Sequence, residues 1–437
     1  MSHGGGRRWP LLEEDRQIAA LALPALGALA AEPLYVLVDT AIVGHLGVAP
    51  LAALALAGAV LSAVVSLCNF LEYASTPKVG RLFAAGDRRA AAAFGRQGTL
   101  LGAGLGVALA AAAIALAEPL VAAMGGRGRV GALAVTYLRI TALGLPCALT
   151  AVAAQGYFRG VARLRMPFVV LLAGNLLNAV LELCLVYGLG WGIAGSAWGT
   201  VAAQAAMAGM FWSVLTGERS AGPRLDRDAL RSLARTGGQL FVRTGSLYAT
   251  FLLAGAVLAR IGSATLAAHQ IAFQLWSFLA LALDALAIAA QVLVSHQLGL
   301  GRVARARQLA ARTLGWSLVV GIVFAAALMA LSGVLPRAFT DDARVLERVG
   351  AIWPIFALMQ PVNAAVFALD GILIGAGDTR FLMWAMPCAA LVFAPLAVAS
   401  LLGGWGIVGV WLALLALILA RLALCAARFA GERWTRH

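Results

Sequence analysis

Several carboxylates lie inside long apolar segments of this 437-residue chain. Glu32, Tyr35 and Asp39 are spaced three and then four residues apart, which places them on one face of a helix. A charged side chain at the centre of a bilayer costs at least ~2.5 kcal/mol on insertion scales, so each one needs a partner or a function. This first stripe therefore marks a candidate site within the membrane.

A second polar stripe has the same spacing, in Asn175, Asn178 and Glu182. Both stripes put a carboxylate beside amide or hydroxyl groups, and such oxygen-only ligand sets suit H⁺ or Na⁺ rather than a soft transition metal. Desolvation and mutual repulsion disfavour the charged forms of neighbouring buried carboxylates, which favours proton uptake. The two stripes predict an ion-coupling site, and the alternative is that these residues only hold helices together.

The second half of the chain offers a different polar set. Arg243 and Asp284 fall in two consecutive apolar segments, where pairing with each other is favoured over contact with a substrate. Asn69 aligns with Asp284 in the internal repeat described below, so both halves keep a polar group at that depth. With Gln274, these residues are candidates for the wall of a substrate cavity.

Two prolines, Pro24 and Pro33, lie inside the first apolar segment. A proline in a helix interior removes a backbone hydrogen bond and bends the helix. The segment is therefore either an element that moves or one with a static kink.

The composition requires a membrane. Hydrophobic residues make up 62% of the chain and charged residues 12%, whereas soluble proteins carry about 25% charged residues. Soluble enzymes, secreted disulfide scaffolds, coiled coils and disordered chains are excluded. The net charge of +14 is scattered between apolar segments, so it does not indicate nucleic-acid binding. No Walker A, H-E-x-x-H or G-x-S-x-G motif is present, so we expect a transporter without cofactors, driven by an ion gradient or by its substrate.

About 20 apolar residues suffice to cross about 30 Å of hydrocarbon. The chain contains twelve such segments, which predicts an all-α membrane protein. The predicted spans are 17–43, 50–76, 95–117, 132–156, 166–188, 192–216, 236–259, 265–292, 312–335, 348–371, 381–402 and 405–428. Most of the 33 Lys and Arg residues fall on the side of both termini, which predicts cytoplasmic termini and a multi-pass protein of the cell inner (plasma) membrane.

The two halves repeat at an offset of 215 residues, at which Gly86 aligns with Gly301 and Gly160 with Gly375. Both copies begin on the same side of the membrane, so we predict two pseudo-symmetric six-helix bundles that face a central cavity. The predicted parts are an N-terminal cytoplasmic tail (1–16), a first six-helix bundle (17–216), a cytoplasmic linker (217–235), a second six-helix bundle (236–428) and a C-terminal cytoplasmic tail (429–437).

The repeat does not duplicate the carboxylates. The counterpart of Asp39 is Ala254 and, after a one-residue slip in the offset, that of Glu182 is Leu396. We therefore expect the ion-coupling site in the first bundle alone.

The chain resembles the multidrug and toxic compound extrusion (MATE) family, in particular its DinF-like branch. The resemblance covers essentially the whole chain and is carried by V-D-T-A-I-V-G-H-L-G (38–47), G-N-L-L-N-A-V-L-E (174–182), G-L-G-W-G-I-A-G-S-A-W-G-T (188–200) and G-A-G-D-T-R (375–380). It implies a V-shaped central cavity and a monomer that exports amphipathic, mostly cationic compounds in exchange for H⁺ or Na⁺ by alternating access. Its partners would be these small substrates and membrane lipids.

The resemblance also implies roles for single residues. The family's cation-coupling residues fall on Asp39, Asn178, Glu182 and Thr200, which would also hold a bound Na⁺. Its cavity positions match Glu32, Tyr35 and Gln155, and the carboxylate of Glu32 would favour cationic cargo.

A flippase for a lipid-linked precursor is the alternative function, since it shares the architecture of the wider superfamily. Such a protein would need a more cationic cavity to hold a phosphate than the acidic residues of the first half provide. A major-facilitator transporter also has twelve spans, but its typical loop motif is absent from 77–96.

Overall fold

The computed structural model describes residues 13–217 and 226–436, which form helices and connections without any β-strand. The first half contains α1 (Glu13–Gly44), α2 (Val48–Cys68), α3 (Phe70–Ala84), α4 (Arg88–Ala115), α5 (Ala117–Ala123), α6 (Gly128–Ala142), α7 (Leu145–Gly160), α8 (Arg165–Glu182), η1 (Leu183–Gly188) and α9 (Gly192–Gly217). The second half contains α10 (Arg227–Ile261), α11 (Ser263–Gly299), α12 (Val303–Ala330), η2 (Pro336–Ala338), α13 (Ala343–Gly375), α14 (Thr379–Leu402), α15 (Gly406–Ala430) and η3 (Arg433–Arg436).

Each predicted span coincides with a helix or a broken helix. Among the described residues, ten helices are long and apolar enough to cross a membrane, or eleven when α6 and α7 are joined across their 52° bend. The span predicted over 192–216 is α9, whose 26 residues include no charged side chain. The span predicted over 50–76 is interrupted at Asn69, which separates α2 from α3.

The predicted repeat is visible in how closely helices approach one another. A Cβ atom on Gly160 would lie 3.0 Å from the carbonyl oxygen of Thr76, and one on Gly375 would lie 2.5 Å from that of Gln291. These pairs stand at the same offset of 215 residues, so α7 rests on α3 as α13 rests on α11. The two halves therefore share one scaffold, as the sequence predicts.

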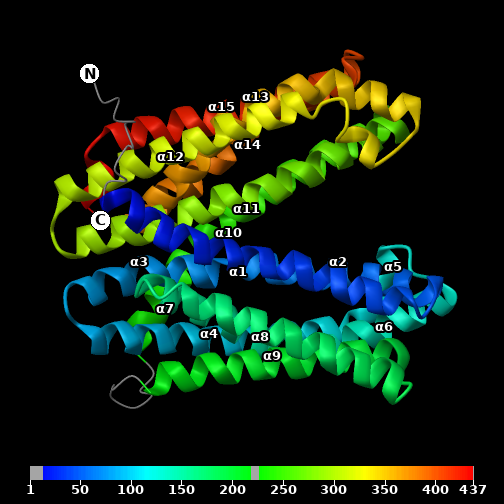
Figure 1. The fold of residues 1–437 in the computed structure, drawn as a ribbon, viewed down its shortest axis with the longest axis horizontal. Helices are drawn as coiled ribbons and strands as arrows, with labels where there is room; N and C mark the ends of the chain where they lie inside the picture. Colours follow the sequence, from blue (N-terminus) through cyan, green and yellow to red (C-terminus); the bar gives the residue numbers. More distant parts are fainter. Residues whose placement is uncertain (1–12, 218–225, 437) are drawn as a thin grey trace, which may run out of the picture.

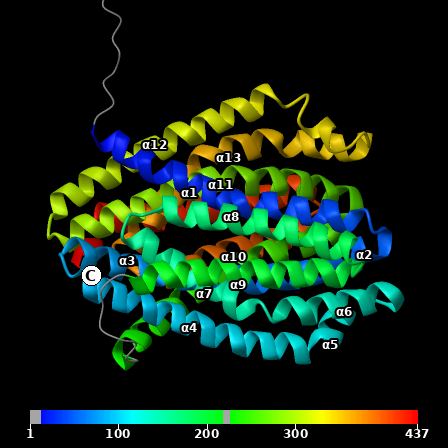
Figure 2. The ribbon, with the colours of Figure 1, turned by 60° about the horizontal axis from the view of Figure 1, so that its bottom comes forward.

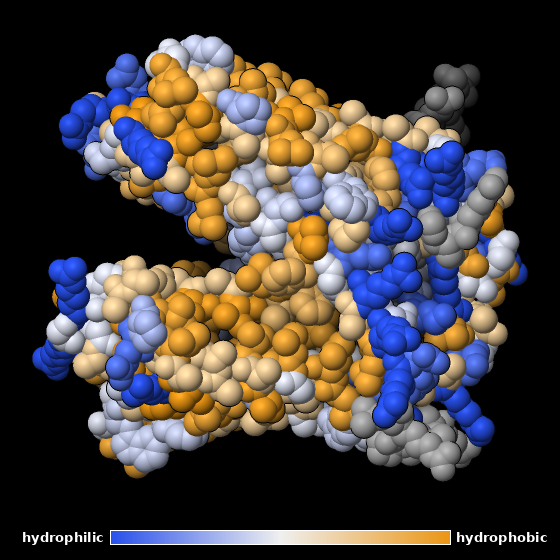
Figure 3. Space-filling view, turned by 180° about the vertical axis from the view of Figure 1, so that it is seen from behind, coloured by the Kyte–Doolittle hydropathy of each residue, from blue (hydrophilic) through white to orange (hydrophobic). Residues whose placement is uncertain are grey.

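The halves form two lobes that diverge toward one end of the molecule (Figure 1). The turned view places α4, α5 and α6 at one edge and α12 and α13 at the opposite edge (Figure 2). Figure 3 shows a cleft between the lobes, and hydrophilic side chains gather at the other end. That other end carries the start of α1 and the α3–α4 and α11–α12 connections, and we call it the closed end.

Polar contacts join the lobes at the closed end, where α3 packs against α11. Arg312 of α12 donates two hydrogen bonds to Asp15 of α1, at 2.7 and 2.8 Å, and the Nε1 atom of Trp316 donates a third at 2.7 Å. The first turn of α1 is thus anchored to the second lobe. Residues 13–16, which were assigned to the N-terminal tail, belong to this helix.

The other predicted boundaries differ from the helices in detail. Helix α10 begins at Arg227, inside the linker predicted over 217–235, and residues 218–225 of that linker lie outside the described residues. The tail predicted over 429–437 is folded up to residue 436, with Trp434 fully buried and its Nε1 atom bonded to the carbonyl of Phe429.

Candidate functional site

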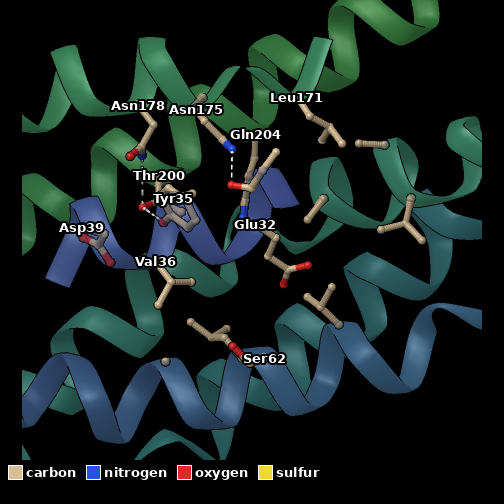
Figure 4. Close-up of a pocket in the computed structure, with 18 of the residues that line it drawn as sticks. Glu32, Tyr35, Val36, Asp39, Ser62, Leu171, Asn175, Asn178, Thr200 and Gln204 are labelled. Atoms are coloured by element: carbon tan, nitrogen blue, oxygen red, sulfur yellow. Dashed lines mark hydrogen bonds between the residues drawn. The ribbon is translucent and has the colours of Figure 1, made fainter. Parts of the chain in front are cut away.

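A cavity of about 590 Å³ lies within the first lobe. Its wall is formed by α1, α2, α3, α6, α7, α8 and α9, and α11 contributes Asp284. Figure 4 shows Glu32 and Tyr35 of α1 on one side of this cavity and Asn175 of α8 on another. Five residues predicted for the substrate cavity line it, namely Glu32, Tyr35, Asn69, Gln155 and Asp284.

The two carboxylates of the predicted ion site meet beside α9. The hydroxyl of Ser196 donates to Asp39 at 2.8 Å and lies 3.3 Å from Oε1 of Glu182. The carboxyl groups of Asp39 and Glu182 approach the same hydroxyl, and both residues are buried. The structure thus brings together two acids that are 143 positions apart in the sequence.

Asn178 and Thr200 complete this cluster. The hydroxyls of Tyr35 and Thr200 are 3.0 Å apart, and the Asn178 amide lies 3.4 Å from Thr200 Oγ1. When the oxygen and nitrogen of the Asn178 amide are exchanged, its NH₂ group donates to Glu182 at 3.0 Å and its oxygen accepts from the backbone N–H of Thr200 at 3.1 Å. Helices α1, α8 and α9 therefore converge on one polar cluster, which brings Asp39 of the first stripe together with Asn178 and Glu182 of the second.

Asn175 does not contact the carboxylate of Glu182, although both belong to the second stripe. Its amide donates to the carbonyl of Ala31 in α1 at 2.9 Å (Figure 4). Ala31 precedes Pro33 by two residues. Helix α1 continues without a break through Pro24 and Pro33. Asn175 thus joins α8 to the proline-containing part of α1.

The donor set limits what the cluster can bind. Asp39, Glu182, Asn178 and Thr200 offer carboxylate, amide and hydroxyl groups, which suit a proton or a monovalent hard cation. Within the described residues, no group of three or more His, Cys, Asp or Glu side chains could hold a metal ion.

The predicted pairing of Arg243 with Asp284 is wrong. Arg243 of α10 pairs with Asp370 of α13, with an N–O distance of 2.5 Å, and Arg421 of α15 contacts the same carboxylate. Asp284 instead faces the first lobe, where Tyr73 donates to it at 3.2 Å. Three helices of the second lobe converge on Asp370, whose single carboxylate is the shared ion-pair partner of both arginines.

Two further predicted cavity residues lie elsewhere. Arg243 is not among the residues that line the cavity, because its guanidinium is held by Asp370. Gln274 is exposed and does not line it either.

Sequence reasoning missed several residues of the site. Ser196 lies one helical turn before Thr200, a spacing that could have revealed it. The span predicted over 132–156 ends before Arg159, but α7 continues to Gly160 and buries it. The Nε atom of Arg159 lies 2.5 Å from the Oε1 atom of Glu72. Asp370 and Arg421 were also not singled out.

Two helical lobes, the first of which holds a cavity with buried acids, define the class, an integral membrane transporter rather than an enzyme. Comparison with known proteins gives the family. A model described as MatE matches residues 24–184 and 245–399, and the chain belongs to this family, as its motifs indicate.

Curated relatives cover nearly the whole chain. The chain is 32% identical to Protein DETOXIFICATION 44, chloroplastic, of Arabidopsis thaliana, over 93% of this chain and 80% of that protein. It is 28% identical to DNA damage-inducible protein F of Escherichia coli, over 98% and 93%. It is 29% identical to a probable multidrug resistance protein NorM of Deinococcus radiodurans, over 94% of both chains.

A solved structure shows the same fold. A mutant of the Vibrio cholerae MATE transporter VcmN superposes with a TM-score of 0.87 at 18% identity, over 97% of this chain and 98% of that chain. The arrangement of two six-helix bundles is therefore that of MATE transporters.

Proposed function

We propose that the protein is a cation-coupled antiporter that exports amphipathic, mostly cationic compounds by alternating access. The observation that carries this proposal is the pair Asp39 and Glu182, which share the Ser196 hydroxyl. Neither acid has an arginine or lysine among its ion pairs in the described part of the chain. Two adjacent carboxylates away from water cannot both stay charged without a counterion, so a proton or Na⁺ completes the site.

The cavity supports a cationic cargo. Glu32 projects into it and is exposed, whereas Glu72 is paired with Arg159. With Asp39 and Asp284, the wall carries four acids and one arginine, and the rest of it is largely apolar. Such complementarity favours amphipathic cations over anions. It also argues against a phosphate-bearing lipid precursor, the cargo of the alternative flippase.

In the proposed cycle, the ion and the cargo bind in turn. With cytoplasmic termini in the cell inner (plasma) membrane, the cleft faces outward, and H⁺ or Na⁺ enters the cluster of Asp39 and Glu182. Neutralisation weakens the attraction for a cationic cargo and changes the shape of α1 at Pro24 and Pro33. Each elementary charge moved contributes ~2.3 kcal/mol per 100 mV of membrane potential.

The test is transport of a fluorescent cation in proteoliposomes under an imposed proton or sodium gradient. We expect one gradient to drive export, and we expect Asp39→Asn and Glu182→Gln to reduce it to the level of protein-free liposomes. Glu118→Gln is the matched control, because Glu118 forms an exposed pair with Arg139. Export that ignores both gradients, or variants that match the wild type, would contradict the proposal and favour lipid flipping.

A second measurement addresses the substrate class. Glu32→Gln removes one negative charge from the cavity wall and leaves the cluster of Asp39 and Glu182 intact. We expect affinity for the cation to fall by about tenfold, equivalent to ~1.4 kcal/mol, and affinity for an uncharged analogue to stay the same. Equal losses for both compounds would show that Glu32 contributes shape rather than charge.

A further inference from the structure

The last turn of α7 lies between the cavity and the closed end. Arg159 lines the cavity, and the carbonyl of the next residue, Gly160, accepts a hydrogen bond from Nε2 of His296 in α11 at 2.6 Å. Consecutive residues of one turn thus contact the substrate compartment and the other lobe.

On the cavity side, Arg159 is held by few contacts. Its Nε atom lies 2.5 Å from Glu72, and its guanidinium carbon is 5.7 Å from the ring centre of Tyr73. The Tyr73 hydroxyl in turn donates to Asp284 of the second lobe at 3.2 Å. The Nη1 atom of Arg159 is buried without a hydrogen-bond partner, so this is not a two-point pair of the kind that fixes an arginine most firmly.

Toward the closed end, Gly160 is the last residue of α7. The last carbonyls of a helix lack partners within it and carry partial negative charge. Those of Tyr157, Phe158 and Arg159 accept backbone N–H groups of the following turn, whereas that of Gly160 accepts from His296. The end of α7 is therefore satisfied by the opposite lobe.

The repeat provides the reciprocal contact. Arg81 of α3 stands at the position equivalent to His296, and its guanidinium donates to the carbonyl of Ala376 at the end of α13. A nitrogen-bearing side chain from each lobe thus caps a helix of the other lobe. These two caps flank the contact between Gly80 and Ser295, where α3 meets α11.

We propose that Arg159 and His296 are positioning residues that couple occupancy of the cavity to opening of the closed end. A cation at the cavity floor competes with Arg159 for Glu72. Release of Arg159 shifts the last turn of α7 and withdraws the Gly160 carbonyl from His296. The inference rests on the proposed function, because it requires a cationic cargo.

The physical requirement is a difference in affinity between two states. A ligand shifts a conformational equilibrium only as far as it binds one state better than the other. Here the difference arises because the pair of Arg159 with Glu72 is intact only while the cation is absent. The coupling path is short, since a single helical turn separates the two contacts.

The experiment measures the distance between spin labels across the closed end, in nanodiscs, with and without saturating ethidium. Labels are placed at Arg89→Cys and Ala304→Cys, which are exposed and equivalent in the repeat, after replacement of the five native cysteines by alanine. Ethidium binding is followed separately by fluorescence anisotropy. We expect ethidium to increase the population with the longer distance in the otherwise unaltered protein.

Two sets of variants separate the steps. We expect His296→Ala to raise the open-to-closed ratio about two- to tenfold without ethidium, the range expected for one lost hydrogen bond. His296→Gln, which keeps a donor, should restore the closed population. The double variant Glu72→Gln with Arg159→Gln keeps the local charge balanced, and its distance should no longer respond to ethidium at saturation. His45→Ala is the control, because His45 is exposed, follows the end of α1 and, within the described part of the chain, has a side chain that hydrogen-bonds only to the carbonyl of Ala41.

The outcomes distinguish the two proposals. A response to ethidium that survives in the double variant would overturn the coupling role of Arg159. A closed population unchanged in His296→Ala would overturn the role of His296. Failure of ethidium to bind the unaltered protein would instead contradict the proposed cationic cargo, whatever the labels report.

Discussion

The two lobes share a scaffold, but the first is hollow and the second is filled. A cavity of about 10 Å³ in the second lobe stands at the place of the 590 Å³ cavity in the first. Residues of the large cavity correspond to aromatic residues of the small one at the offset of 215, in the pairs Val36 and Phe251, Gly58 and Phe273, Leu61 and Trp276, and Thr141 and Phe356. The volume of these side chains, rather than the path of the helices, therefore decides which lobe has space for a ligand.

The lobes also differ in the partners of their buried acids Asp370, Asp39 and Glu182. Asp370 of the second lobe is neutralised by Arg243 and Arg421, so its charge is fixed by the protein. Asp39 and Glu182 of the first lobe contact a hydroxyl and an amide instead. The charge of Asp370 is thus fixed by its two arginines, whereas Asp39 and Glu182 have no arginine partner among the described residues and leave a charge for a mobile ion to balance.

The largest expected effect distinguishes these two kinds of acid. Asp370→Asn leaves two buried guanidinium groups without a counter-charge, and removing one partner of a buried ion pair costs about 3–5 kcal/mol. We expect a marked drop in the unfolding temperature of the purified protein, measured by tryptophan fluorescence in detergent. Asp39→Asn is the comparison and should leave that temperature nearly unchanged. Similar losses in both variants would remove the distinction between the lobes.

The next test fills the hollow lobe. Gly58→Phe introduces the residue that the second lobe carries at Phe273, and a side chain at Gly58 meets no atom within 4 Å at its Cβ position. The ring then occupies the cavity, so ethidium affinity should fall by about tenfold or more, equivalent to ~1.4 kcal/mol. Ala63→Phe, on an exposed part of α2 that does not line the cavity, is the control. Unchanged binding in Gly58→Phe would show that the cargo lies elsewhere.

The smallest effect concerns the turns that follow α7 and α13. Ala162 has a φ of 59°, and its counterpart Gly377 has a φ of 78°. A left-handed conformation costs an L-residue roughly 1–2 kcal/mol that glycine avoids. Ala162→Gly should therefore stabilise the protein by about 1 kcal/mol, and Gly377→Ala should destabilise it, both measured by thermal unfolding. Shifts of the same sign would mean that the two turns are not equivalent.

The sequence predicted the helices and the main cluster because hydropathy and helical spacing are local properties. Asp39, Asn178 and Glu182 lie on faces that periodicity identifies, and packing brings those faces together. The partner of Arg243 could not be predicted in this way, because Asp284 and Asp370 were both available and only the rotation of the helices decides between them. Arg159 was overlooked because hydropathy ends a span at the first charge, whereas the pair with Glu72 allows α7 to continue.

The aromatic filling of the second lobe has a consequence for stoichiometry. A duplicated carrier with two equal cavities would load zero, one or two molecules, and its binding curve would be a sum over both compartments. With Phe251, Phe273, Trp276 and Phe356 in place, the cavity of the second lobe is about 10 Å³, against about 590 Å³ in the first lobe. Under the proposed function each turnover moves a single cargo, and a titration should saturate at one molecule per chain.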